Sequence, residues 1–139
     1  FSHTQLKKGF EFFPEMGSWA KEADASQLPY EDKSFDAVMS SAVILHNEYS
    51  KAQKIICEMI RVSRKFLIHN EDTDITFSRY GYDMAKTYRV MGFKIVVSQE
   101  IPSSQVPSDT QFTIAEIPSD MGKIRPEDVP LCYHKNDSR

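Results

Sequence analysis

The chain has 139 residues, of which 40% are hydrophobic and 27% charged, and its formal net charge is −3. This length and balance are typical of one globular domain with a single core. No apolar run approaches the roughly 20 residues that span a bilayer, and Lys and Arg are scattered, so we expect neither a membrane nor a nucleic-acid partner. Cys57 and Cys132 lie far apart without metal-ligand spacing, which favours a cytoplasmic location and gives no reason to expect a metal.

The first third of the chain predicts one helix and two strands. Ser2 and Gln5 have the spacing of a capping box, and the apolar residues that follow predict a helix ending before Pro14. A short strand is expected at 19–23. A longer strand is expected at 35–45, where an almost continuous apolar run suits a strand buried on both faces of a parallel sheet.

The remainder predicts two helices, three strands and a tail. A second capping-box pair, Ser50 and Gln53, precedes the clearest helical periodicity, with Lys54 and Glu58 as an exposed pair on its outer side. In order, the expected elements are a helix from Ser50 to beyond Ile60, a strand at 65–69, a helix at 78–91 ended by Gly92, and antiparallel strands at 93–98 and 112–117.

This order of elements predicts an α/β fold. We expect a Rossmann-like, doubly wound and mostly parallel sheet with a C-terminal antiparallel hairpin, incomplete at its N-terminus. Residues 1–117 would form the domain, and the polar, proline-containing residues 118–139 a loosely ordered tail. Because ligands of such sheets bind beyond the carboxyl ends of the strands, the polar residues after strands 35–45 and 65–69 are the candidate site.

One stretch carries a family resemblance. DASQLPYEDKSFDAVMSSAVILH, residues 24–46, followed by EMIRV at 58–62, resembles class I S-adenosylmethionine-dependent methyltransferases. The shared pattern is an acidic residue, a Leu-Pro-aromatic turn, a Ser-Phe-Asp corner, a strand and a helix that ends in Arg-Val. The resemblance covers about residues 2–117. It implies S-adenosylmethionine as cofactor and methyl transfer to a small-molecule or saccharide-like acceptor.

The resemblance also implies roles for individual residues near the cofactor. Asp24 would accept a hydrogen bond from the adenine amino group, the backbone at Ala25 would meet the ring, and Leu28 would pack on the base. The residues that end the strand would lie beside the methionine part of the cofactor; they are Ser40, Ser41 and Ala42.

The substrate side is expected to contain His46, which is also the candidate catalytic base. A histidine in a loop after a strand can accept a proton from an oxygen or nitrogen acceptor, although a capping or surface histidine is the alternative. His69, Glu71 and Asp72 follow the next strand and could line the substrate pocket with Tyr80. Glu71 and Asp72 could equally be solvated loop charges, and Tyr80 a core residue.

Two departures from the family pattern shape the functional hypothesis. Arg61-Val62 continues as SRKF where the family has a Pro-Gly-Gly turn, and the glycine-rich loop and ribose-binding acidic residue of the first two strands are absent. We therefore expect a chain that opens on Phe1 to be the C-terminal half of a methyltransferase, inactive alone and completed by an N-terminal half or a partner chain. The alternatives are a non-catalytic methyltransferase-like module that packs on a partner chain and, with no phosphate loop to support it, a nicotinamide-binding fold.

Overall fold

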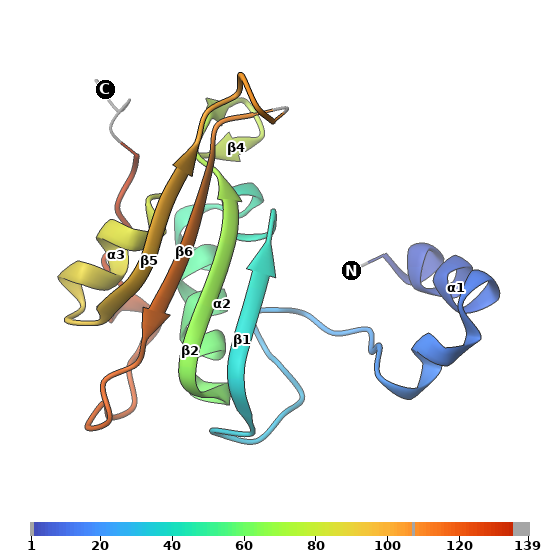
Figure 1. Ribbon diagram of the computed structural model, residues 1–139. Helices are drawn as coiled ribbons and strands as arrows, with labels where there is room; N and C mark the ends of the chain where they lie inside the picture. The colour runs from blue at the N-terminus through green and yellow to red at the C-terminus, as the bar shows by residue number, and fades with distance from the viewer. Residues whose placement is uncertain (1, 107, 135–139) are drawn as a thin grey trace.

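The computed structural model describes residues 2–106 and 108–134, and its centre is a mixed four-stranded sheet (Figure 1). The strands lie in the order β1 (Phe35–Ser41), β2 (Ser63–Asp72), β6 (Thr110–Glu116) and β5 (Lys94–Ile101). Only β1 and β2 are parallel, whereas β6 is antiparallel to both of its neighbours. The α/β class and the C-terminal hairpin are thus confirmed, and the mostly parallel sheet is corrected to a mixed one.

Helix α2 (Tyr49–Val62) supplies most of the core on the covered face of the sheet. Its apolar side chains recur every three or four residues and are buried together; they are Ala52, Ile55, Ile56, Met59 and Ile60. The helix begins earlier than expected, with Glu48 at the N-cap, and the Ser50 hydroxyl donates to the Glu48 carboxylate (3.1 Å). The predicted helix is confirmed, but Ser50 is not its cap.

Strand β1 is shorter and more exposed than predicted. It ends at Ser41, and Ile44–His46 form a turn of 3-10 helix, η2. Most β1 residues are exposed because β2 is the only strand paired with it among the described residues, so the expectation of burial on both faces is wrong for this part of the chain. The strand expected at 19–23 is also wrong, since those residues make no strand pairing.

The segment before α3 (Met84–Val90) departs from the predicted helix at 78–91. Residues 75–80 instead form a small hairpin of β3 (Ile75–Thr76) and β4 (Arg79–Tyr80). Gly81 follows with a φ of 61°, and a Cβ there would lie 2.7 Å from the Thr73 carbonyl oxygen, so a helix cannot pass through this position. The Asp83 carboxylate caps α3 by accepting from the Lys86 N–H (2.8 Å). Gly92 ends it with a φ of 82°, as predicted.

Residues 118–134 pack against the helices and are not a loosely ordered tail. Val129 has 0% of its surface exposed, and Leu131 is also buried in the core. The backbone is held from both helices: the Gln53 amide donates to the Val129 carbonyl (2.8 Å), and the Thr87 hydroxyl accepts from the Cys132 N–H (3.0 Å). A few apolar residues in a polar segment are thus enough to order it through η3 (Pro126–Asp128), while residues 135–139 lie outside the described residues.

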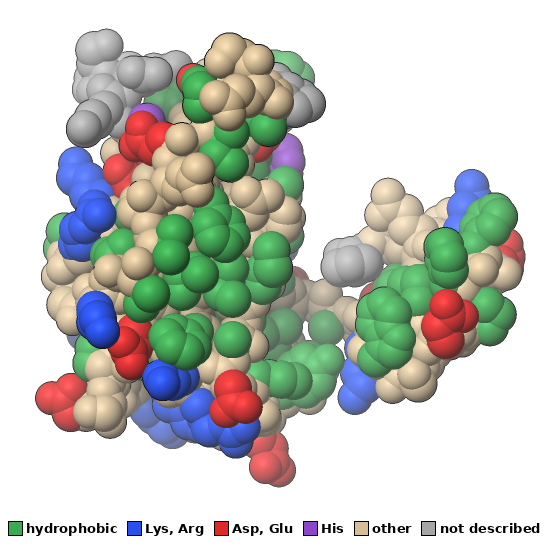
Figure 2. All heavy atoms as spheres, in the orientation of Figure 1, with side chains coloured by type: hydrophobic (Ala, Val, Ile, Leu, Met, Phe, Trp, Pro, Cys, Tyr) green, Lys and Arg blue, Asp and Glu red, His purple; other side chains and the backbone are tan. Residues whose placement is uncertain are grey.

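Helix α1 (His3–Phe12), followed by η1 (Pro14–Ser18), lies apart from the sheet in Figure 1. The helix predicted before Pro14 is confirmed, although no side-chain bond of Ser2 caps it. Helices α2 and α3 cover one face of the sheet and leave the other open. Figure 2 shows hydrophobic side chains gathered on the open face. Met39, Ile68 and Ile114 are neighbours in the strand register and alternate with buried residues, which places them on this face; Met39 is 59% exposed, and the two isoleucines are half-buried.

None of the described helices is long and apolar enough to cross a bilayer. In the described part of the chain, no group of three or more potential metal-ligating side chains comes together.

Candidate functional site

The candidate site lies where the parallel strands β1 and β2 end. The chain leaves β1 through Ala42, whose φ of 51° is in the left-handed region and whose N–H donates to the Asn70 carbonyl (3.0 Å). The Glu71 carboxylate lies beneath the following turn and accepts from the N–H groups of Val43 (3.1 Å) and Leu45 (3.4 Å). A side chain of β2 therefore holds the loop that follows β1.

A buried hydrogen-bonded chain continues from this carboxylate. The Ser40 hydroxyl lies 2.6 Å from Glu71 Oε1 and 2.8 Å from His69 Nδ1. On the other side of the imidazole ring, His69 Nε2 lies 2.7 Å from the Tyr88 hydroxyl of α3. His69 is 0% exposed and Glu71 2%, so these side chains lie beneath the loop and not on its surface.

Burial alters the acid–base properties of this chain of groups. Burial lowers the pKa of the His69 imidazole to about 3, which keeps the ring neutral. Burial also raises the pKa of the Glu71 carboxyl, against the hydrogen bonds from the Ser40 hydroxyl and the N–H groups of the loop. The pKa of the Tyr88 phenol is raised well above its ordinary value by burial.

His46 lies at the exposed end of η2 and faces the small hairpin. Its Nδ1 is 3.0 Å from the Ser78 carbonyl oxygen, which can only accept, so Nδ1 carries the hydrogen. In the neutral ring the Nε2 lone pair is then left for a proton. Phe77, at the tip of the hairpin, is 104% exposed, and sequence reasoning gave it no role.

The other two residues of the predicted substrate side also lie at this end of the sheet. Asp72 forms an ion pair with Arg79 of β4 (3.1 Å). Tyr80 is partly exposed and stacks on the buried Tyr82, with ring centroids 5.8 Å apart. Of the substrate-side set, His46 and Tyr80 are therefore exposed, Asp72 is half-buried, and His69 and Glu71 are buried.

Asp24 and Ala25 border a hollow of about 410 Å³ beside the loop after β1. The Oδ1 atom of Asp24 accepts from the Ser26 N–H (2.9 Å) and hydroxyl (2.7 Å), which lowers the pKa of the carboxyl. Its Oδ2 atom has only a distant neighbour in Lys51 Nζ (3.8 Å). The hollow is completed by Val43 and Asn47 of the loop and by residues of α2. The structure thus brings the acidic residue of the sequence pattern to the end of β1.

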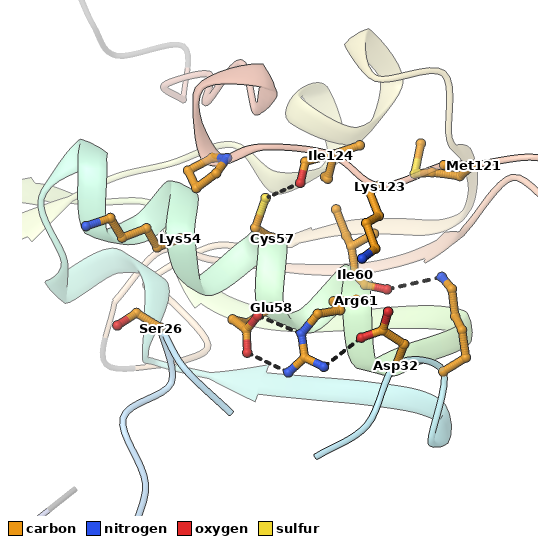
Figure 3. Close-up of a pocket in the computed structure, with 13 residues that line it drawn as sticks. Ser26, Asp32, Lys54, Cys57, Glu58, Ile60, Arg61, Met121, Lys123 and Ile124 are labelled. Atoms are coloured by element: carbon orange, nitrogen blue, oxygen red, sulfur yellow. Dashed lines mark hydrogen bonds and ion pairs between the residues drawn. The ribbon is translucent and has the colours of Figure 1, made fainter. Parts of the chain in front are cut away.

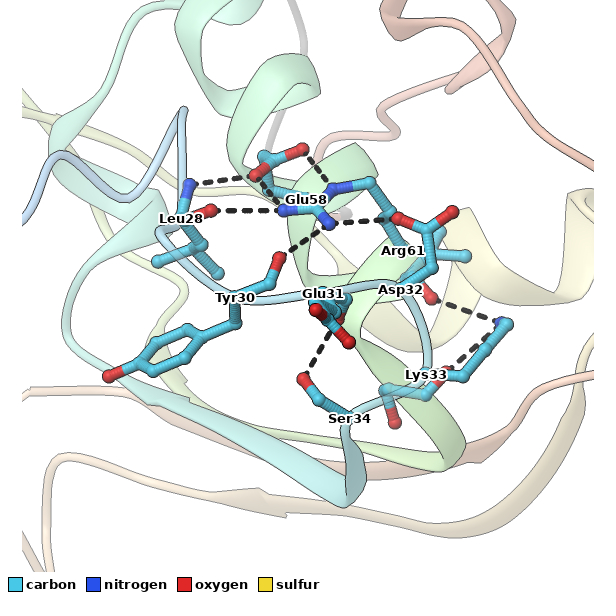
Figure 4. A network of polar contacts seen from close by, with 10 residues as sticks. Leu28, Tyr30, Glu31, Asp32, Lys33, Ser34, Glu58 and Arg61 are labelled. Carbon is cyan, nitrogen blue, oxygen red and sulfur yellow. Dashed lines mark hydrogen bonds and ion pairs between the residues drawn. The ribbon is translucent and has the colours of Figure 1, made fainter.

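The chain between Asp24 and β1 is held by two residues of α2, as Figure 4 shows. Arg61 donates to the carbonyls of Leu28 (3.0 Å) and Tyr30 (2.7 Å), and Glu58 accepts from the Leu28 N–H (2.7 Å). Glu58 also pairs with Arg61 (2.7 Å), so the expected Lys54–Glu58 surface pair is wrong. Leu28 does not border the hollow beside Asp24. The Arg-Val end of the motif was visible in the sequence, and the three-residue spacing of Glu58 and Arg61 was the signal for this contact.

A second hollow, of about 370 Å³, lies toward the other end of α2 (Figure 3). Cys57, Met121 and Ile124 form much of its wall. Among its ionised groups, Arg61 pairs with Glu58, and Lys33 Nζ donates to backbone carbonyls at the end of α2. This hollow is at the amino ends of the parallel strands and contains none of the predicted site residues. The carboxyl ends of the parallel strands therefore remain the candidate site.

The chain is similar to known proteins in sequence and in fold. Residues 2–66 match a family described as a methyltransferase domain, and no curated protein matches the chain in sequence. A protein of Pyrococcus horikoshii OT3 superposes with a TM-score of 0.64 at 18% identity, over 84% of this chain and 68% of its own. The cyclase SpnF gives 0.63 at 17%, over 84% and 63%. Magnesium protoporphyrin IX methyltransferase from Synechocystis PCC 6803, solved with bound SAH, gives 0.63 at 14%, over 84% and 61%.

At these identities the superpositions show the fold. The chain spans about three fifths to two thirds of the length of these three structures.

Proposed function

We propose that this chain is part of a class I S-adenosylmethionine-dependent methyltransferase domain and forms the adenine side and the acceptor side of a site for methyl transfer to a small-molecule or saccharide-like acceptor. The observation that carries the proposal is the position of Asp24. Its carboxylate stands at the rim of a hollow at the carboxyl ends of the parallel strands, where α/β folds of this kind bind ligands.

The residues around the hollow fit the adenine end of the cofactor. Adenine presents an amino group that donates and a ring nitrogen that accepts. Asp24 Oδ2 is free of the Ser26 bonds and can accept, and the Ala25 N–H, which donates to none of the described residues, can supply the second bond. Val43 and Ile55 give the hollow an apolar wall against which a ring can pack.

The remaining predicted cofactor residues differ in how close they lie to the surface of the candidate site. Ser41 and Ala42 are exposed at the end of β1, where we propose that they border the methionine part of the cofactor. Leu28 and Ser40 would act from further away. Leu28 would pack along the turn that presents Asp24. Ser40 would act from beneath the loop.

S-adenosylmethionine supplies an activated methyl group, so the protein's own contribution is to hold the acceptor in line and to accept its proton. We propose His46 as the base because its Nδ1 hydrogen is fixed on the Ser78 carbonyl, which leaves Nε2 to take the proton. Phe77 and Tyr80 are exposed aromatic rings at the same end of the sheet and can stack on a flat or sugar-like acceptor.

The rest of the cofactor site would come from further polypeptide, either of the same protein or of a partner chain. Two features support this proposal. The outer edge of β1 has no partner strand among the described residues. Unpaired backbone groups of that kind destabilise the fold when they are buried, and when exposed they can pair with another strand. The open face of the sheet is apolar around Met39, Ile68 and Ile114, as expected for a surface that other elements cover.

The proposal is tested by titrating S-adenosylmethionine into the protein that contains this chain together with its completing segment. Asp24→Ala is expected to weaken binding roughly tenfold or more, because a hydrogen bond to a charged group contributes about 1.5–3 kcal/mol. Asp36→Ala is the matched control, since Asp36 is an exposed acid that pairs with Arg64 on β2 away from the hollow. Equal affinities for the Asp24 variant and the wild type would remove Asp24 from the site.

A non-catalytic module that packs on a partner chain is the second candidate, and the open apolar face favours it. The fold alone does not establish methyl transfer, because it is shared with a protein described as a cyclase. Incubation with S-adenosylmethionine radiolabelled in its methyl group separates them. Label transferred to a small molecule supports the enzyme, whereas a protein that neither binds the cofactor nor transfers label supports the module.

A further inference from the structure

Four polar side chains from three elements meet in the core below the candidate site. They are Ser40 of β1, His69 and Glu71 of β2, and Tyr88 of α3, and all four are buried. Consecutive distances along the chain are 2.6, 2.8 and 2.7 Å. Ionisable side chains are seldom buried without a purpose that offsets their loss of hydration.

The hydrogen atoms of this group can be placed by elimination. A Glu71 carboxylate can only accept, so Ser40 donates to it and must accept from His69 Nδ1. His69 Nε2 then has a lone pair, which accepts from the Tyr88 hydroxyl. The reverse direction would leave the Tyr88 hydrogen without an acceptor among the described residues. Every bond thus points from α3 toward Glu71.

The chain ends on the backbone of the loop after β1. Glu71 Oε2 accepts from the N–H groups of Val43 and Leu45, and these two groups lie inside the turn that carries Ala42 to His46. That turn starts with a non-glycine residue at positive φ, a conformation that costs roughly 1 kcal/mol and persists only where its surroundings hold it. The carboxylate is the group positioned to hold it.

We propose that Tyr88, His69, Ser40 and Glu71 are positioning residues that fix the loop Ala42–His46 from beneath. Tyr88 and His69 orient Ser40, and Ser40 orients the carboxylate that accepts from the loop. The loop carries Val43 at the edge of the hollow and His46 at its far end. The link to methyl transfer rests on the proposed function, whereas the control of the loop does not.

The loop is tested by hydrogen exchange at the amides of Val43 and Leu45, measured by NMR on the protein in the absence of any ligand. Glu71→Gln replaces an acceptor oxygen with a donor of similar size, so exchange at both amides is expected to rise about tenfold or more. Tyr88→Phe removes only the far end of the chain and should produce a smaller rise at the same two amides. Thr87→Val is the matched control, because Thr87 is a buried hydroxyl on the same helix whose bonds go to Asp83 and Cys132.

Two results would overturn the proposal. One is unchanged exchange at Val43 and Leu45 in Glu71→Gln. The other is a rise that is equally large in the β5–β6 ladder, which would mark a general loss of stability. Since no cofactor is present, failure of the methyltransferase proposal does not affect this measurement.

The direction of the bonds has a spectroscopic signature that packing alone does not require. Nitrogen-15 spectra of His69 should show a neutral ring with the hydrogen on Nδ1, the less common tautomer in water, and Tyr88→Phe should shift the Nε2 resonance. A hydrogen on Nε2 would contradict the proposed order of donors. In the cofactor-binding protein, Glu71→Gln should also weaken S-adenosylmethionine binding while Thr87→Val does not, and equal effects of the two variants would break the link between the loop and the cofactor.

Discussion

At the scale of single residues, alternation along β2 decides which polar groups meet a ligand. His69 and Glu71 share one face of the strand and are buried beneath α3 and the loop, whereas Asn70 and Asp72 share the other face and are half-buried. The sequence indicated that polar residues end this strand. The sequence did not indicate which face of the strand is buried, because burial depends on α2 and α3 covering only one side of the sheet. The two-residue repeat of a strand was nevertheless predictable from the sequence, and it places His69 and Glu71 on one face and Asn70 and Asp72 on the other.

His69 predicts a specific pH dependence of stability. Its pKa is about 3 in the folded chain, well below the ordinary value of 6.5, so the neutral ring favours the folded state. This contribution is complete above pH 6.5 and is lost as the pH falls toward 3; between about pH 7.5 and 5.5 the loss is about 1.4 kcal/mol. We expect denaturant titrations to show that, between these pH values, the wild type loses about 1.4 kcal/mol more stability than His69→Gln.

Protonation of Glu71 changes the stability in the opposite direction from protonation of His69. Because burial raises the pKa of its carboxyl in the folded chain, protonation of Glu71 favours folding as the pH falls. Both proteins in the comparison retain Glu71, so the difference between wild type and variant isolates the histidine. Parallel curves for the two proteins would show that His69 is not buried as a neutral ring.

At the scale of elements, predictions held where periodicity was long and failed where local chemistry overrode it. The apolar spacing of α2 predicted that helix, and the two apolar segments near 95 and 114 predicted the hairpin of β5 and β6. The start of α3 was misplaced by six residues, from Ser78 to Met84, since Gly81 and the Asp83 cap impose a boundary that the aromatic spacing concealed. Residues 118–134 were misjudged because only Val129 and Leu131 of this otherwise largely polar segment are buried in the core.

The C-terminal segment gives a prediction at this scale. Leu131→Ala is expected to lower the free energy of unfolding by about 2–4 kcal/mol, because it removes a buried side chain that packs with α2 and α3. Val90→Ala, on the exposed side of α3, is the control and should change it by less than about 0.5 kcal/mol. Chemical denaturation monitored by fluorescence measures both. Equal stability of the Leu131 variant and the wild type would show that the segment is not part of the core.

At the scale of the whole molecule, one face of the sheet is covered by helices and the other face is open. Helices α2 and α3 cover one face of the sheet, while the opposite face and the outer edge of β1 remain open among the described residues. The motif at residues 24–46 could be recognised from the sequence because it is local. Its three-dimensional setting could not, since the shape of the hollow depends on Lys51 and Ile55 of α2 as well.

The most direct test of the account is hydrogen exchange mass spectrometry of the cofactor-binding protein with and without S-adenosylhomocysteine, the product form of the cofactor. We predict protection of peptides that cover residues 23–28 and 41–48, on the two sides of the hollow beside Asp24. Peptides that cover residues 118–126, beside the second hollow, should exchange at the same rate in both conditions. Protection confined to residues 118–126, or no protection at 23–28, would contradict the assignment of this stretch to the cofactor.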